Sequence, residues 1–141
     1  MNRSGLLILT ALPLSCAWAA DAPDPGLYEV ATEMVSTELP VPPTTITTRN
    51  CLTRADLDRD ISQVFADLPE GASCDIDTFE MAGGHISMAL RCVTPTGDMQ
   101  VETSGVYTSG SYSMSSIVTM PLGDRMLTIN SKIEGKRVGE C

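Results

Sequence analysis

Hydrophobic and polar residues alternate along most of this chain, which is the pattern of β-strands that bury one face. In GLYEVATEMVS one face carries Tyr28, Val30, Thr32 and Met34, and the other carries Glu29, Ala31 and Glu33. The three prolines of LPVPP end this first strand, because proline has no backbone N–H to donate to a ladder. The β-branched segment TTITTRNC then predicts a second strand.

A single helix is expected in TRADLDRDISQVFADL, from Thr53 to Leu68. Thr53 is placed to cap its first turn, with Asp56 three residues later. Apolar residues recur at helical spacing along this segment, namely Leu57, Ile61, Val64, Phe65 and Leu68.

The segment CDIDTFEMAGGHISMALRC predicts a hairpin, because the two glycines at its middle accept the positive φ angles of a tight turn. A turn centred near Gly83 sets Cys74 opposite Cys92 and Thr78 opposite Met88. Residues two apart in a strand share a face. The residues expected on the core side are Cys74, Ile76, Ile86, Met88, Leu90 and Cys92.

Three more alternating segments follow, MQVETSGVYTSG, SYSMSSIVTMP and RMLTINSKIEGKRV, and glycine with proline, serine or aspartate marks each junction. The sum is a mainly β chain: an antiparallel meander of about seven strands that forms a barrel or a strongly curved sheet, with one helix packed against it. Small residues at mid-strand either leave a cavity or let a curved sheet bend tightly. The core-facing residues expected here are Met99, Val101, Thr103, Gly105, Tyr107, Tyr112, Met114, Ser116, Val118, Met120, Leu127, Ile129, Ser131 and Ile133.

The start of the chain has the composition of a secretory signal peptide. Arg3 precedes the apolar run LLILTALPL, which is shorter than the stretch of about 20 residues that spans a membrane. Ala17 and Ala19 fit the small-residue rule for cleavage. We therefore expect a signal peptide over residues 1–19 and a single exported β-rich domain over residues 20–141.

A lipoprotein is the alternative form of export. Ser15 precedes Cys16 as in a lipidation box, but Pro13 occupies a position where such boxes usually carry an aliphatic residue. We therefore expect a periplasmic or secreted protein whose signal is cleaved near Ala19, with no membrane span in the mature chain.

The exported part is strongly acidic. The whole chain carries 18 acidic and nine basic residues, and loss of Arg3 with the signal leaves a formal charge of −10. Such a field repels polyanions, so nucleic acid and anionic lipid surfaces are not expected as ligands. We interpret the acidity as a means of solubility outside the cytoplasm.

Four cysteines remain after the signal is removed: Cys51, Cys74, Cys92 and Cys141. An even number in an exported chain predicts two disulfides. Their wide spacing, without a C-x-x-C, argues against a zinc site or a thioredoxin-type redox pair. Because the hairpin register joins Cys74 to Cys92, the second bond would join Cys51 to Cys141 and hold the last strand against the segment that enters the helix.

The sequence offers no catalytic constellation. His85, the only histidine, lies at the glycine turn, where a solvent-exposed side chain is expected. Asp75, Asp77 and Glu80 fall on a predicted strand, and we interpret their carboxylates as solvated surface rather than as an acid/base pair. No nucleophile motif, zinc motif or phosphate loop is present. The prediction is a protein without enzyme activity, metal or cofactor.

Seven methionines remain after the signal is removed. Thioethers can fill an irregular core, line a flexible apolar pocket or bind copper. Because no M-x-M or M-x-x-M occurs and histidine is scarce, we favour core filling, with the apolar pocket second. Met81 and Met126 are expected to lie off the core side. The residues that would line an apolar pocket are Met88, Met99, Met114, Met120, Tyr107 and Tyr112.

Four features together resemble the bacterial domain of unknown function family 3617: PGLYEV after the signal, CLTRADL at the helix start, the cysteines Cys74 and Cys92, and a closing GKRVGEC. Its members have a signal peptide, a PGLWE-like strand, a CLTPE-like segment, Met-rich strands and a terminal G-x-C. The resemblance covers 25–141, with Tyr28 for the usual tryptophan and Arg54 for the usual proline. It implies an exported bacterial protein of a Gram-negative periplasm and brings no activity with it.

Three functional hypotheses follow. In the first, the domain binds an apolar or lipid-like molecule between its Met-lined face and the helix. In the second, it is a non-enzymatic interaction or structural protein of the envelope that meets a partner protein through a sheet edge or through its acidic surface. An exposed, unpaired first strand around Tyr28 to Met34 would favour this hypothesis. The third, an enzyme, would need a desolvated carboxylate beside Tyr107 or His85.

Overall fold

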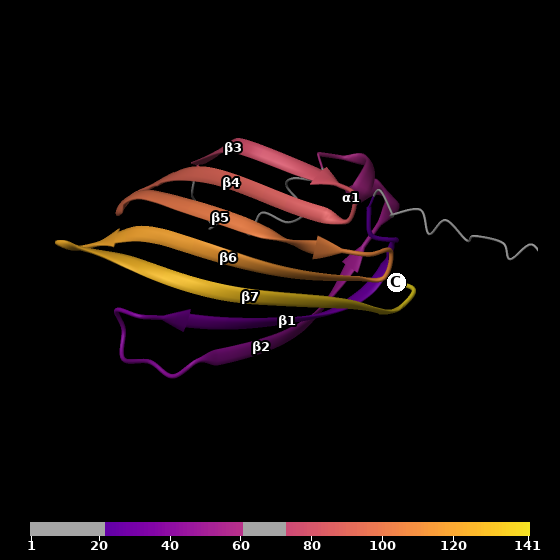
Figure 1. Cartoon of the computed structure of the whole chain (residues 1–141), viewed down its shortest axis with the longest axis horizontal. Coiled ribbons are helices and arrows are strands. Elements are labelled where there is room, and N and C mark those ends of the chain that lie inside the picture. Colours follow the sequence, from indigo (N-terminus) through magenta and orange to yellow (C-terminus); the bar gives the residue numbers. More distant parts are fainter. Residues whose placement is uncertain (1–21, 61–72) are drawn as a thin grey trace, which may run out of the picture.

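The computed structural model describes residues 22–60 and 73–141, which form seven antiparallel strands and one short helix (Figure 1). The elements are β1 (Gly26–Ser36), β2 (Thr44–Leu52), α1 (Arg54–Asp58), β3 (Ser73–Ala82), β4 (His85–Thr94), β5 (Gly97–Tyr107), β6 (Ser111–Leu122) and β7 (Arg125–Gly139). The mainly β class and the seven antiparallel strands are confirmed. The predicted meander holds only from β3 to β7, because β2 and β3 are not neighbours in the sheet.

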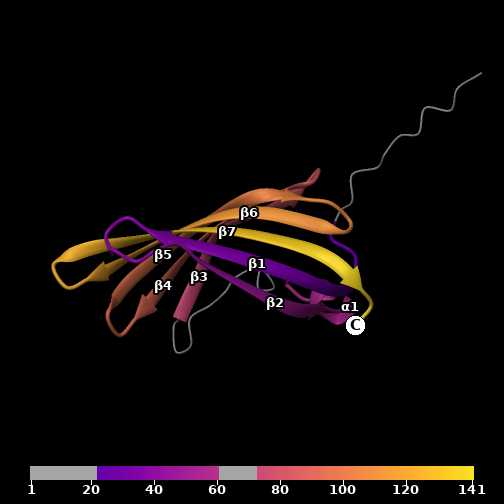
Figure 2. The ribbon, with the colours of Figure 1, turned by 90° about the horizontal axis from the view of Figure 1, so that it is seen from below.

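All seven strands belong to one sheet in the order β2-β1-β7-β6-β5-β4-β3. The chain runs as a meander from β3 to β7, and β1 then lies beside β7 with β2 outside it (Figure 1). The sheet is open and curved (Figure 2). The predicted alternative of a closed barrel is therefore wrong. A barrel would close only if β2 paired with β3, and these strands form the two opposite edges of the sheet.

The registers show which residues share a face. Met88 lies opposite Thr103, Thr103 opposite Ser116, Ser116 opposite Ser131, and Ser131 opposite Met34, so one row crosses β4, β5, β6, β7 and β1. This face, which we call the apolar face, contains all the residues expected on the core side of the last three strands. The opposite face carries most of the charged side chains, which is the usual division of an antiparallel sheet.

Burial on the apolar face is greatest in three clusters. The first cluster contains Met88, Leu90, Cys92 and Met99. The second contains Tyr28, Val30 and Leu52, and the third contains Ile86, Tyr107 and Met114. Half-buried side chains such as Phe79, Met81 and Ile133 pack against them.

The hairpin forms as predicted up to a β-bulge at Asp77. Cys74 lies opposite Cys92 and Ile76 opposite Leu90, but the register then shifts between Ile76 and Thr78. As a result Phe79, rather than Thr78, lies opposite Met88. The extra residue also turns Met81 toward the apolar face, where it packs against the third cluster, so its predicted position off the core side was wrong.

The turn between β3 and β4 is the tight one that its glycines predicted. Ala82 lies opposite His85, and Gly83 and Gly84 between them have φ angles of 59° and 81°. Both values lie in the left-handed region, where glycine has no steric penalty.

The helix begins as predicted but is shorter. The Thr53 hydroxyl accepts a hydrogen bond from the backbone N–H of Asp56 at 3.1 Å, and the Asp56 carboxylate accepts one from the Thr53 N–H at 3.0 Å, which completes a capping box. The Asp56 carboxylate also accepts a hydrogen bond of 2.6 Å from the Thr53 hydroxyl, and this bond, together with the one from the Thr53 N–H, lowers the pKa of Asp56. α1 ends at Asp58, since Arg59 is extended, and the rest of the predicted helix, 61–68, lies outside the described residues.

Candidate functional site

The six residues predicted to line an apolar pocket all project from the apolar face. Met88 and Met114 are each 4 % exposed, and Met99 and Tyr107 each 5 %. Tyr112 and Met120, both on β6, are half-buried. The structure therefore places the first four in the packed clusters and leaves two partly open.

Along the central rows of the apolar face, exposure increases toward β2. Met88 on β4 and Thr103 on β5 are buried, whereas Met34 on β1 is half-buried and Ile46 on the edge strand is 47 % exposed. At the tyrosine end, by contrast, the face stays buried across β1 and β2, through Tyr28, Val30 and Leu52. We call the following partly exposed residues of this face the apolar band: Val118, Met120, Ile129, Ile133, Met34 and Ile46. Val118, Met120 and Ile133 pack against the buried clusters on one side. Half-exposed aliphatic side chains beside a packed core are the type of surface that apolar ligands use.

Two hydroxyls interrupt the apolar face at its centre. Thr103 and Ser116 are each 6 % exposed and lie opposite each other on β5 and β6. The Thr103 hydroxyl donates a hydrogen bond of 3.0 Å to the Ser116 oxygen. Because each satisfies the other, these buried hydroxyls add little cost to an otherwise apolar surface.

Two stacked tyrosines close one end of the apolar face. The ring centroids of Tyr28 and Tyr112 are 5.9 Å apart, and Gly135 of β7 lies opposite Tyr112. A Cβ at Gly135 would come within 2.1 Å of the Tyr112 ring. Glycine is thus required there so that the ring can lie flat on the strand.

The Tyr28 hydroxyl ties β1 to the turn between β5 and β6. It is bonded to the carbonyl oxygen of Asp24 at 2.7 Å and to that of Ser109 at 3.2 Å. Burial, assisted by the negative charge of Asp24, raises the pKa of Tyr28. The hydroxyl therefore stays protonated and serves as a structural donor.

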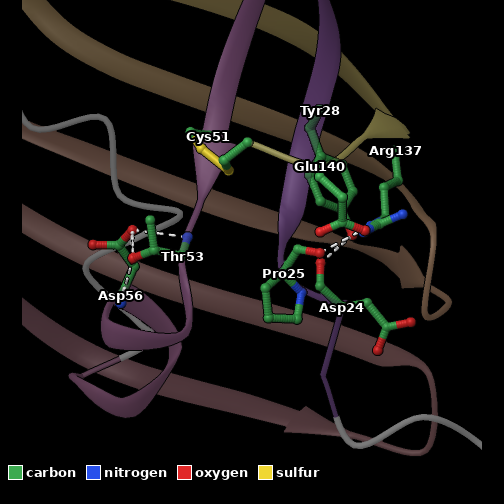
Figure 3. Close-up of a disulfide and its surroundings, with 9 residues drawn as sticks. Asp24, Pro25, Tyr28, Cys51, Thr53, Asp56, Arg137 and Glu140 are labelled. Carbon is green, nitrogen blue, oxygen red and sulfur yellow. Dashed lines mark hydrogen bonds and ion pairs between the residues drawn. A yellow bond between two sulfur atoms is a disulfide. The ribbon is translucent and has the colours of Figure 1, made fainter.

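The same corner holds the segment that precedes β1 (Figure 3). The backbone N–H of Asp24 donates to the Ser109 carbonyl at 2.7 Å, and Arg137 Nε donates to the Pro25 carbonyl at 2.9 Å. Arg137 also pairs with Glu140. We call the set of Asp24, Pro25, Tyr28, Ser109 and Arg137 the tyrosine clamp. The alternation of apolar and polar residues in the sequence does not predict this clamp, because most of its hydrogen-bonding groups belong to the backbone.

Both predicted disulfides are present. Cys74–Cys92 joins directly opposed residues of β3 and β4, and Cys92 is fully buried. Cys51–Cys141 joins the end of β2 to the last residue after β7, and both cysteines are exposed (Figure 3). The two bonds thus hold opposite edges of the sheet.

The groups considered for catalysis are all exposed: Glu80 and His85 line one solvent-open hollow, and Asp75 and Asp77 lie beside Arg91. His85 is exposed at the start of β4, and Asp75 and Glu80 are exposed on the edge strand β3. Asp77 pairs with Arg91 at 2.9 Å on the solvent side. Among residues 22–60 and 73–141, no group of three or more His, Cys, Asp or Glu side chains is arranged to hold a metal ion.

The face opposite the apolar one is polar and shallowly hollowed. Ser87, Ser104 and Ser115 lie opposite one another on β4, β5 and β6, and their small side chains leave hollows of about 430 Å³ and 300 Å³ that are open to solvent.

The described part of the chain contains no helix that could span a bilayer.

Together, the open seven-stranded sheet and its two disulfides define a small disulfide-bonded β-protein suited to an oxidising, extracytoplasmic environment. The chain belongs to the family described as Protein of unknown function (DUF3617), whose family model matches residues 23–141. This confirms the family that the motifs indicated. No curated protein and no solved structure matches the chain.

Proposed function

We propose that this protein is an exported, non-enzymatic binding module that takes an apolar, lipid-like molecule against the apolar band. The observation that carries the proposal is the gradient of exposure along the central rows of a single face. Met88 is 4 % exposed, whereas Met34, in the same cross-strand row, is half-buried and Ile46 at the edge is 47 % exposed. Apolar surface left open beside a packed core is costly in water unless something covers it.

The composition of the band suits a ligand of loose shape. Methionine has three rotatable bonds and a polarisable sulfur, so Met34 and Met120 can adapt to acyl chains of different length. Aliphatic Ile129 and Ile133 lie between them on β7, and all four point from the same face. The formal charge of −9 for the whole chain disfavours an anionic headgroup close to the surface, so a neutral or zwitterionic ligand fits best.

The alternative is a non-enzymatic interaction or structural protein of the envelope. An exposed, unpaired first strand would favour it, but β1 pairs with β2 on one side and with β7 on the other. An unpaired β1, which would favour this alternative, is therefore not found. The only strands of the described sheet with an unpaired edge are β2 and β3.

Native mass spectrometry of protein purified from the periplasm tests the proposal. We expect an adduct with the mass of a lipid or another apolar molecule. In parallel, the neutral probe N-phenyl-1-naphthylamine should bind to delipidated protein and be displaced by the extracted molecule. Protein that carries no adduct and binds no probe would contradict the proposal.

A matched pair of variants locates the site. Ile129→Gln changes the apolar band, whereas Ile117→Gln changes a residue that is 45 % exposed on the opposite face of β6. We expect Ile129→Gln to weaken probe binding by about tenfold or more, because it removes a methyl-rich contact and adds an amide. Ile117→Gln should leave binding unchanged; equal effects of both variants would place the ligand elsewhere.

A further inference from the structure

The two edges of the sheet are built differently. The β3 edge carries Asp75, Asp77 and Glu80 and is interrupted by the bulge at Asp77. Charges and bulges are the devices by which natural proteins keep an edge strand from pairing with another chain. The β3 edge is thus protected.

The β2 edge has no bulge and no acidic residue. β2 pairs with β1 in an unbroken register over nine residues, from Thr44 to Leu52, without a bulge. Four threonines and Ile46 make it rich in β-branched residues, which favour strands. Its one charged residue, Arg49, is already paired with Glu29 of β1 at 3.1 Å. In the described part of the chain no strand pairs with its outer side.

We propose that the outer edge of β2 pairs, in antiparallel orientation, with β2 of a second copy of this chain. The prolines before Thr44 cannot donate ladder hydrogen bonds, so pairing is confined to the nine residues of β2. All nine overlap only when Thr48 lies opposite Thr48 of the second copy. Two-fold symmetry then makes the contact self-complementary, as in most homodimers.

Charge is compatible with this pairing. In the centred register Arg49 of each copy lies opposite Thr47 of the other, and the two Arg49 side chains are diagonal neighbours on one face, where each is already paired with its own Glu29. No acidic residue lies opposite another across the contact. The acidic copies still repel each other over longer distances, so pairing should strengthen as salt screens that repulsion.

Exposed apolar residues beside β2 also favour pairing with a second copy. Leu39, Val41 and Ile46 are 37 %, 55 % and 47 % exposed, and all three lie in or just before β2. Ile46 projects from the apolar face, in the row of Thr32 and Ile133. Pairing through β2 would join the apolar bands of two copies into one surface across a continuous sheet, which extends the proposed ligand site but does not depend on it.

Sedimentation of the disulfide-bonded mature protein tests the pairing, from about 10 µM to about 1 mM, the range in which small interfaces associate. We expect a reversible dimer whose population rises with salt. Thr47→Lys places two lysines opposite the arginines and should raise the dimer dissociation constant about tenfold, whereas Thr47→Glu should lower it. Thr78→Lys makes the same substitution on the exposed β3 edge and should have no effect.

A cysteine at the symmetry axis tests the register. The Thr48→Cys variant should form a disulfide between the two introduced thiols, one from each copy, on mild oxidation, because opposed strand residues lie within disulfide reach. Peptide mapping must show both native disulfides intact, and urea unfolding confirms that each variant folds. A monomer at all concentrations, equal effects of Thr47→Lys and Thr78→Lys, or an extended peptide bound to β2 in place of a second copy would overturn the proposal.

Discussion

The two sides of the sheet are held together in different ways. On one side, β3, β4 and β5 follow one another in the chain, and Cys74–Cys92 links residues only 18 apart. On the other side, β1 and β2 from the start of the chain meet β7 from its end, and Cys51–Cys141 links residues 90 apart. We call these the hairpin half and the closing half.

The difference shows which part of the fold depends on covalent and polar ties. The hairpin half buries Met88, Leu90, Cys92 and Met99 through local pairing. The closing half packs fewer buried side chains and relies on the tyrosine clamp and an exposed disulfide. Pairing between strands far apart in the chain costs more chain entropy before the contacts between them form. We therefore expect the closing half to be the less stable part.

Removal of each disulfide gives the largest effect. The double variant Cys51→Ser with Cys141→Ser should lower the free energy of unfolding by about 4–5 kcal/mol. The double variant Cys74→Ala with Cys92→Ala should lower it by about 3 kcal/mol through the loss of the cross-link, because the smaller loop restrains the unfolded chain less. Urea unfolding measures both. Thiol labelling after limited reduction with dithiothreitol under native conditions should find Cys51 and Cys141 reduced first, since both are exposed. A larger loss from the hairpin bond would break the comparison.

Truncation of two methionines in one row compares the packing of the halves. Met88→Ala should cost about 2–5 kcal/mol, the range for buried methionines. Met34→Ala, in the closing half, should cost about 1 kcal/mol, because its half-exposed side chain loses less burial. Chemical denaturation with equal slopes for the two variants is the measurement. Equal losses would mean that the apolar face is packed uniformly.

Substitution at Gly135 tests the contact on which the tyrosine end depends. Gly135→Ala should cost about 1–3 kcal/mol, because its Cβ would overlap the Tyr112 ring. Tyr112→Ala removes the obstacle, so the double variant should be less destabilised than the two single losses together. Strict additivity in thermal unfolding would show that the ring is not held against the strand.

Tyr28→Phe has the smallest expected effect, about 1 kcal/mol, from the loss of hydrogen bonds to two backbone carbonyls. The raised pKa of Tyr28 also predicts a pH dependence. Its contribution is complete below the ordinary value of 10.0 and is lost as pH rises toward the folded-state pKa, because the unfolded chain ionises first. Unfolding measured from about pH 8 to about pH 11 should show a steeper alkaline loss for the wild type than for Tyr28→Phe.

Much of the fold followed from the sequence because its main signals are local. Alternation identified the apolar face, and the two glycines fixed the hairpin that pairs Cys74 with Cys92. That pairing left Cys51 and Cys141 for each other. The bulge was missed, although a signal for it exists: Ile76 and Phe79 cannot both face the core without an extra residue between them.

Closure of the sheet could not be predicted in the same way. Whether β2 and β3 meet depends on the accumulated twist and curvature of seven strands, which no single residue encodes. The tyrosine clamp was also missed, because its acceptors are the carbonyls of Asp24, Pro25 and Ser109, and the turn that carries Ser109 lies far from Tyr28 in the chain. The gradient of exposure along the central rows of the apolar face follows from this open architecture.

The bond between Cys51 and Cys141 also determines how the molecule transmits mechanical force. It closes β3 to β7 into a covalent ring, so tension applied at the two ends passes from Cys141 through sulfur directly into Cys51. Only the stretch that contains β1 and β2 would carry load, and the other five strands would remain slack until the bond is reduced. Pulling with and without reductant should therefore give a short extension and a long one.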